Sequence, residues 1–191
     1  MRCDVRLFVA IELDDVTRQA VAAEQKRLVQ SLGDAASEWR FVRPAQLHVT
    51  LLFLGEVEAA QASSIVEAMR HQIDRPVYTM AVDGLGMFPR HGVARVLWLN
   101  LVEGVEQTLD VYARIQARLD PLGVPRESRP LAPHLTLARR RRGRGRVRLD
   151  PTAAGGILAR WQVDGVQLIE SRLSSDGPIY RTLATAGLMH P

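Results

Sequence analysis

The sequence predicts one domain of mixed strands and helices, built as two related lobes that face one another. Its 191 residues are 47% hydrophobic and 24% charged, which is typical of a globular protein of one domain. Each half of the chain follows one order: a strand, a helix, a loop with proline and a strand that opens with His-x-Thr, at His48 and again at His134. A twofold repeat of this length is too long for a solenoid and favours two lobes.

The first half begins with a buried strand over residues 5–12, a nearly continuous apolar run. Asp14 or Asp15 can cap the helix that follows, because apolar side chains recur at near-helical spacing until Gly33. The remaining elements are expected in this order: extended chain over 39–42, a break at Pro44, a strand over 47–54 ending at Gly55, a helix over 58–73, a strand over 77–82, and turns through Gly84, Gly86 and Pro89.

The second half starts with a strand over 93–102 and a helix over 105–122, whose apolar side chains recur every three or four residues. Prolines then mark a loop, and Pro133 leads into a strand over 134–139. A short helical turn over 152–158 and two closing strands, over 161–170 and 179–186, complete the expected elements.

Positive charge is concentrated in one segment. Seven arginines fall within residues 139–148, and without them the formal net charge of +4 would become −3. Guanidinium groups bind phosphate oxygens in pairs, so this segment is a candidate for contact with nucleic acid. A run of charges is also typical of a solvated loop, and the pattern alone leaves both interpretations open.

The sequence favours a soluble cytoplasmic protein that does not bind membranes. Cys3 is the single cysteine, so the chain has no internal disulfide and no cysteine cluster for zinc or iron–sulfur. The apolar run near the N-terminus is too short for a signal peptide, and no stretch approaches the roughly 18 apolar residues of a membrane span.

The two His-x-Thr motifs carry the chemistry. Side chains of a strand alternate between its faces, so His48 and Thr50 are expected on one face, with Val49, Leu51 and Phe53 on the other. The same alternation puts His134 beside Thr136. If the lobes face each other, two imidazoles and two hydroxyls meet in one groove.

This set of groups suits phosphoryl transfer. A neutral imidazole can accept a proton from attacking water while a protonated one donates to the leaving oxygen, because the pKa of histidine lies near neutrality. The hydroxyls of Thr50 and Thr136 can donate hydrogen bonds to phosphate oxygens in the transition state. The scheme needs no metal.

Two other interpretations apply to the same residues. A lone His-x-Thr usually packs at a strand edge, but two copies at equivalent places in a repeat favour an active site over packing. A zinc site would use His48 and His134 with a third ligand, and no His, Asp or Glu lies at ligand spacing near either motif. We therefore expect no metal and no cofactor.

At these residues the chain resembles the 2H phosphoesterase superfamily, and within it the bacterial LigT-type RNA 2',3'-cyclic phosphodiesterases, historically named 2'-5' RNA ligases. The resemblance covers nearly the whole chain. It lies in five segments, residues 6–11, 47–56, 95–99, 129–139, and Ser171 with 177–180.

The resemblance implies an α+β fold with two pseudo-symmetric lobes, whose antiparallel sheets form a central cleft with both motifs on its floor and the helices outside. Residues 1–191 would form one such bilobal domain. It also implies metal-independent hydrolysis of an RNA 2',3'-cyclic phosphate to a 2'-phosphate, with reversible 2'-5' ligation in some members. His48 resembles the general acid at the 3' oxygen, His134 the general base on water, and Thr50 and Thr136 the groups that hold phosphate oxygens.

Substrate contacts are expected beyond the catalytic residues. Arg139 resembles a phosphate-contacting arginine, and Arg140 and Arg141 would extend the contact along a longer RNA. Where many relatives carry an aromatic residue before the second motif, this chain has Leu131, so a platform for the base would be missing or supplied elsewhere.

The expected partners are RNA ends with a 2',3'-cyclic phosphate, tRNA fragments among them, bound by a monomer. Two alternatives stay open at this point. One is a phosphodiesterase for a small cyclic phosphate or a 2'-5' linked oligonucleotide, and the other is a module that binds RNA ends without turning them over.

Overall fold

The computed structural model describes residues 4–89, 92–127, 129–141, 156–175 and 177–190. Its strands are β1 (Val5–Glu12), β2 (Trp39–Phe41), β3 (His48–Val57), β4 (Ile73–Pro76), β5 (Tyr78–Phe88), β6 (Val96–Glu103), β7 (His134–Arg140), β8 (Ala159–Val163), β9 (Gly165–Ser174) and β10 (Gly177–Met189). The helices of this described part are α1 (Asp15–Leu32), α2 (Ala59–Ala68) and α3 (Val105–Leu119), with short 3-10 turns η1 (Gly33–Glu38), η2 (Pro44–Gln46) and η3 (Asp120–Leu122). The fold is α+β, as expected.

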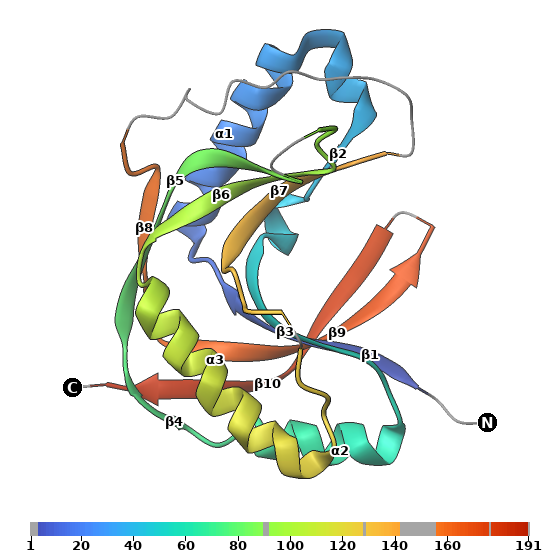
Figure 1. The fold of residues 1–191 in the computed structure, drawn as a ribbon, viewed down its shortest axis with the longest axis vertical. Helices are drawn as coiled ribbons and strands as arrows, with labels where there is room; N and C mark the ends of the chain where they lie inside the picture. The colour runs from blue at the N-terminus through green and yellow to red at the C-terminus, as the bar shows by residue number, and fades with distance from the viewer. Residues whose placement is uncertain (1–3, 90–91, 128, 142–155, 176, 191) are drawn as a thin grey trace.

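The strands hydrogen-bond in one path, β4-β10-β9-β1-β3-β7-β6-β5-β8, with β2 pairing to β7 outside it (Figure 1). The middle of the path is narrow, because β3 and β7 pair through Val49 and Leu135. The expected two separate sheets are therefore one continuous set of strands, joined where the two His-x-Thr motifs begin.

The internal repeat is visible in the topology. β1, α1 and β3 correspond to β6, α3 and β7, and in each set the two strands pair antiparallel. The two halves of the chain then exchange strands, because β5 pairs with β6 and β9 pairs with β1. On each side of the β3–β7 pair, the sheet thus contains strands from both halves of the chain. A lobe therefore does not correspond to one half of the chain.

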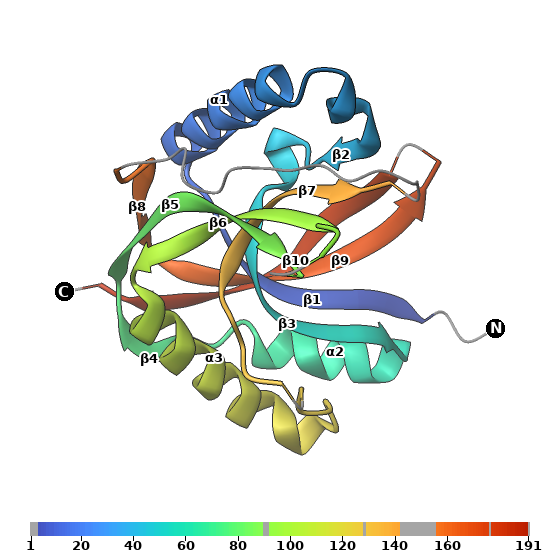
Figure 2. The same cartoon turned by 45° about the horizontal axis from the view of Figure 1, so that its top comes forward.

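The helices lie outside the curved sheet. α1 contacts β8 on the side of β5, β6 and β7, while α2 and α3 contact β10 and β4 on the opposite side (Figure 2). The Asp14 carboxylate caps α1 by accepting a hydrogen bond of 2.7 Å from the Thr17 N–H. No helix in the described part of the chain is long and apolar enough to cross a membrane.

Several predicted boundaries were wrong. α2 ends at Ala68 rather than residue 73, and the chain then forms β4. The strand expected over 161–170 is divided between β8 and β9. Of the helical turn expected over 152–158, residues 152–155 lie outside the described residues and 156–158 are not helical.

The glycines at 84 and 86 do not end β5, although the sequence suggested turns there. Gly84 has φ of +63° and lies at a register shift between β5 and β6, which is typical of a bulge. At Gly86 a Cβ would collide with the ring of Trp98, so glycine lets the indole lie flat against the strand. β5 therefore continues through both glycines.

Candidate active site

The antiparallel register of β3 and β7 brings the two motifs together. Val49 pairs with Leu135, so the residues on either side are cross-strand neighbours: His48 is set opposite Thr136, and Thr50 opposite His134. In this register the four side chains of the two motifs lie on the same face of the sheet, opposite to Val49 and Leu135. This arrangement follows from the narrow junction in the middle of the sheet.

A bulge in β3 corrects one expectation. The pairing of β1 with β3 shifts between Leu52 and Thr50, so that Leu51 is an extra residue. The bulge reverses the alternation beyond it and turns Phe53 to the face of His48 and Thr50, not to the buried face as predicted. The Phe53 side chain is 63% exposed.

β7 has the corresponding bulge. Its pairing with β6 shifts between Thr136 and Ala138, leaving Leu137 as the extra residue. Strict alternation would put residue 140 on the face of Thr136, but the bulge puts Arg139 there instead. The two motifs thus place Phe53 and Arg139 at equivalent positions.

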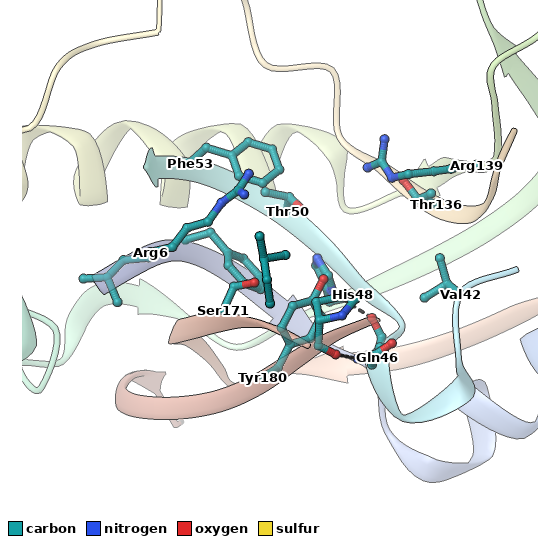
Figure 3. A pocket seen from close by; sticks show the side chains of 14 residues that line it. Arg6, Val42, Gln46, His48, Thr50, Phe53, Thr136, Arg139, Ser171 and Tyr180 are labelled. Atoms are coloured by element: carbon teal, nitrogen blue, oxygen red, sulfur yellow. Dashed lines mark hydrogen bonds between the residues drawn. The ribbon is translucent and has the colours of Figure 1, made fainter. Parts of the chain in front are cut away.

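A cavity of about 440 Å³ opens over these residues (Figure 3). His48, Thr50, Thr136 and Arg139 all line it. Its other lining residues are Arg6, Leu7, Phe8, Val42, Gln46, Phe53, Ser171, Leu173, Pro178 and Tyr180. Three of the four predicted catalytic residues and one predicted phosphate contact therefore share one cavity.

His134 lines a second, more apolar cavity of about 660 Å³, which shares Thr50 and Phe53 with the first. Phe88, Tyr112 and Leu131 also line it. The two histidines thus lie at adjoining cavities whose common wall carries Thr50.

The two imidazoles are held in the same way. The Nδ1 of His48 lies 2.7 Å from the Gln46 carbonyl oxygen, and the Nδ1 of His134 lies 2.8 Å from the Ala132 carbonyl oxygen. A carbonyl only accepts hydrogen bonds, so in each neutral imidazole Nδ1 carries the proton and Nε2 has the lone pair. Each Nε2 is the atom that can exchange a proton with a ligand.

Each imidazole also lies against two aromatic rings. The rings of Phe8 and Tyr180 have centroids 5.0 and 5.6 Å from that of His48. The rings of Phe88 and Trp98 lie 5.2 and 5.7 Å from that of His134. These contacts, with the Nδ1 bonds, restrict the orientation of both imidazoles.

The surroundings of His48 keep it neutral. Burial lowers the pKa of His48, the hydrogen bond to the Gln46 carbonyl raises it less, and the charge of Arg139 lowers it further. Burial also raises the pKa of Tyr180, against the opposing charges of Arg139 and Arg6. In the free protein at neutral pH, His48 is therefore an unprotonated imidazole and Tyr180 a neutral phenol.

The three predicted substrate arginines have different surroundings. Arg139 lines the cavity with His48, and Arg141 lines an adjoining cavity. The Arg140 side chain is 5% exposed, forms an ion pair with Glu38 and lines neither cavity, so it belongs to the packing between β7 and η1 and not to the site. The other arginines of the predicted strip, Arg142, Arg144, Arg146 and Arg148, lie outside the described residues.

Sequence reasoning assigned no site role to several side chains that the fold brings to the cavity. Gln46 donates a hydrogen bond to the Pro178 carbonyl while its own carbonyl accepts from His48, so it connects the motif to the β9–β10 hairpin. Arg6 and Phe8 reach the cavity from β1, and Ser171 and Tyr180 are cross-strand partners in that hairpin. The repeat could not indicate Ser171 and Tyr180, because the second half of the chain adds their hairpin beside β1.

A metal site is not evident in the described part of the chain. There, no three His, Cys, Asp or Glu side chains lie close enough together to hold a metal ion. Among the described lining residues of the 440 Å³ cavity, the ionisable groups are one imidazole, two guanidiniums and a phenol, with no carboxylate.

Comparison with known families gives one match over most of the chain. The family model described as LigT like Phosphoesterase matches residues 16–98 and 102–180. Both His-x-Thr motifs fall within these segments.

Two relatives are both named RNA 2',3'-cyclic phosphodiesterase. One, from Thermus thermophilus, is 32% identical over 189 residues, covering 94% of this chain and 88% of its own. The other, from Archaeoglobus fulgidus, is 32% identical over 180 residues, covering 94% and 98%.

Solved structures agree with these relatives. A crystal structure from T. thermophilus superposes with a TM-score of 0.80 at 28% identity, covering 95% of this chain and 97% of its own. E. coli LigT in its apo form gives a TM-score of 0.78 at 25% identity, covering 97% and 98%, and its complex with 3'-AMP gives 0.76 at 26%.

Proposed function

Since the chain belongs to the LigT-like phosphoesterase family, we propose that it is an RNA 2',3'-cyclic phosphodiesterase that hydrolyses a terminal 2',3'-cyclic phosphate to a 2'-phosphate. The observation that carries this proposal is the cross-strand arrangement of the two motifs, which sets an imidazole opposite a hydroxyl twice. Phosphoryl transfer needs two proton-transfer groups and hydrogen-bond donors for the phosphate oxygens, and the site provides both.

The cyclic phosphate would bind in the 440 Å³ cavity between the two motifs. The hydroxyls of Thr50 and Thr136 donate hydrogen bonds to its non-bridging oxygens. The guanidinium groups of Arg139 and Arg6 offset the negative charge from the two sides of the cavity (Figure 3). These contacts strengthen as charge builds on the phosphorane oxygens.

The two histidines move the protons. By family resemblance, His134 Nε2 takes a proton from a water whose oxygen bonds to phosphorus, and His48 Nε2 gives a proton to the 3' oxygen as its bond to phosphorus breaks. The products are a 2'-phosphate and a free 3'-hydroxyl. Burial disfavours the imidazolium form of His48 in the free protein. The negative charge of the bound phosphate favours that form, so substrate binding would protonate His48 and make it the general acid.

The terminal base would stack on Phe53. The bulge of β3 leaves this ring exposed between the phosphate cavity and the apolar cavity of about 660 Å³. An exposed aromatic face beside an apolar cavity suits any nucleobase. Phe53 would then supply the platform that Leu131 does not.

We further propose that RNA fragments, including tRNA fragments, are substrates for a monomer acting in the cytoplasm. Reversible 2'-5' ligation would occur when the 5'-hydroxyl oxygen of a second RNA, in place of water, bonds to phosphorus and the 3' oxygen leaves. The molar mass in solution tests the monomer, and an assay that mixes an RNA ending in a 2',3'-cyclic phosphate with an RNA carrying a 5'-hydroxyl tests the ligation.

The decisive experiment incubates chelator-treated protein with a short RNA ending in a 2',3'-cyclic phosphate and identifies which hydroxyl keeps the phosphate. A 2'-phosphate supports the proposal. A 3'-phosphate would show that the 2' oxygen leaves instead of the 3' oxygen. If folded protein gives no product, the proposed activity is overturned in favour of binding alone.

A further inference from the structure

A third cavity, of about 550 Å³, adjoins the one that holds His48. The two share Gln46, Arg139 and Tyr180 on their walls, together with Val42 and Pro178. The apolar cavity beside Phe53 shares no lining residue with this third cavity. The three cavities therefore form one groove, in which the phosphate cavity lies between the apolar cavity and the third cavity.

The third cavity is strongly basic, and we name it the arginine cavity. Arg40, Arg43, Arg139 and Arg141 line it, and its described lining residues include no acid. Arg40 and Arg139 are direct cross-strand partners in β2 and β7.

Arg141 is the cavity arginine best suited to bind a ligand from outside the fold. Its backbone N–H donates a hydrogen bond of 2.8 Å to the Glu38 carbonyl, which anchors the residue just beyond β7. Its side chain is exposed, whereas the Glu38 carboxylate is taken by Arg140. Arg40 and Arg43 have contacts of their own within the protein, so the argument rests on Arg141 and Arg139.

We propose that the arginine cavity binds the phosphodiester on the 5' side of the terminal nucleotide. The inference rests on the proposed function. With the cyclic phosphate between the motifs and its base toward Phe53, the chain continues through the 5' oxygen of the terminal ribose, away from the base. The next charge along the RNA is that phosphodiester, and the cavity offers it the guanidinium groups of Arg139 and Arg141. The preferred substrate is then an RNA end of at least two nucleotides, not a cyclic mononucleotide.

The test compares three substrates: adenosine 2',3'-cyclic phosphate, the dinucleotide ApA with the same cyclic end, and that dinucleotide with a neutral methylphosphonate in place of its internal phosphodiester. The protein is used as wild type, Arg141→Gln, Arg141→Lys and Arg70→Gln. Arg70 is an exposed arginine on the turn after α2 and lines none of these cavities, so it controls for the loss of one positive charge.

We expect wild type to prefer the charged dinucleotide over the methylphosphonate by about tenfold in kcat/KM, the order of one charge-assisted contact. Arg141→Gln should remove most of that preference, Arg141→Lys should restore part of it, and Arg70→Gln should retain it. The slope of log kcat/KM for the charged dinucleotide against log salt should become shallower by about 0.7 in Arg141→Gln.

The outcomes separate the two proposals. Hydrolysis of all three substrates with no preference for the internal charge, or with a preference that Arg141→Gln leaves intact, overturns the assignment of the arginine cavity. Hydrolysis of none of them by folded wild type overturns the proposed function instead.

Discussion

At the scale of single residues, the two histidines are held alike but have different environments. Both donate Nδ1–H to the carbonyl two residues earlier, at Gln46 and at Ala132. His48 is enclosed by Phe8 and Tyr180 and its pKa is lowered by burial. The repeat gives the two imidazoles the same tautomer, and their neighbours distinguish them.

Replacing either histidine should abolish most of the activity. We expect His48→Ala and His134→Ala each to lower kcat by a factor on the order of 10² or more on a cyclic-phosphate RNA, because each removes one proton-transfer group. His71→Ala, which alters a histidine that lines none of these cavities, is the control. Full activity in either motif variant, with an unchanged thermal unfolding curve, would disprove the two-histidine mechanism.

The roles of acid and base can be separated by the leaving group. A substrate whose leaving oxygen is an activated phenol needs little protonation, so it should rescue His48→Ala and not His134→Ala if His48 is the acid. Rescue of the His134 variant alone would exchange the two roles. The measurement is kcat for both variants on the activated and the natural substrate.

The lowered pKa of His48 predicts a pH dependence of stability. The folded protein binds a proton at His48 more weakly than the unfolded chain does. Protonation of the unfolded chain therefore lowers the free energy of unfolding as the pH drops below about 6.5 toward the lowered pKa of His48. Above about pH 6.5 both states are neutral at this residue, and it adds no pH dependence. In His48→Asn this contribution is absent.

Urea unfolding at pH 7.5 and pH 5.5, in buffers without phosphate, measures it. The free energy of unfolding should decrease more between these pH values in wild type than in His48→Asn. An equal decrease in both proteins would show that burial does not perturb His48.

At the scale of elements, the two bulges decide which side chains reach the cavity. In β7 the carbonyl of the extra residue, Leu137, accepts hydrogen bonds from the Val42 N–H and from Nε2 of Gln25, a buried side chain of α1. Nε2 of Gln25 also donates to the Val42 carbonyl. Gln25 thus supports the bulge that turns Arg139 toward the cavity.

We therefore predict that Gln25→Leu destabilises the protein by about 1–3 kcal/mol, because the Val42 carbonyl loses a buried partner. As a positioning change, it should raise KM more than it lowers kcat, since Arg139 is the proposed phosphate contact and the histidines remain in place. Gln30→Leu, an exposed position on the same helix, is the matched control. A loss of stability without any change in KM would limit Gln25 to a role in folding.

At the scale of the whole molecule, the two halves of the chain are interleaved. β5 from the first half completes the pairing of β6, and β9 and β10 from the second half extend the sheet beyond β1. Neither half can satisfy its strand edges alone. We propose on this basis that residues 1–191 form one folding unit.

This proposal predicts one cooperative transition for the whole chain, and no folding for its halves. The fragments 1–89 and 92–191, expressed separately, should lack a cooperative melting transition, because β1 loses its neighbour β9 in the first and β6 loses its neighbour β5 in the second. Mixing the two should restore secondary structure and activity together. A cooperative melting transition in either fragment alone would divide the chain into two domains.

Much of the molecule could be predicted from local sequence. The buried strand over 5–12, the capped helix after it and the helix after Gly104 are confirmed, because their hydrophobic periods reflect which face each element buries. The repeat of His-x-Thr indicated the residues that β3 and β7 now set opposite one another. The turns predicted at Gly84 and Gly86 were wrong, because glycine also occurs at a bulge and at a close contact with an aromatic ring.

The sequence by itself determined the chemical groups and the pairing of each histidine with a threonine, since alternation along a strand is a local property. The resemblance indicated Arg139, and only the tertiary structure decided that Phe53 lines the same cavity while Arg140 does not. Bulges arise from how one strand registers against its neighbours, and a shift of one residue changes the face of every side chain beyond it. The same holds for Tyr180 and Arg6, which reach the cavity through strands paired across the whole length of the chain.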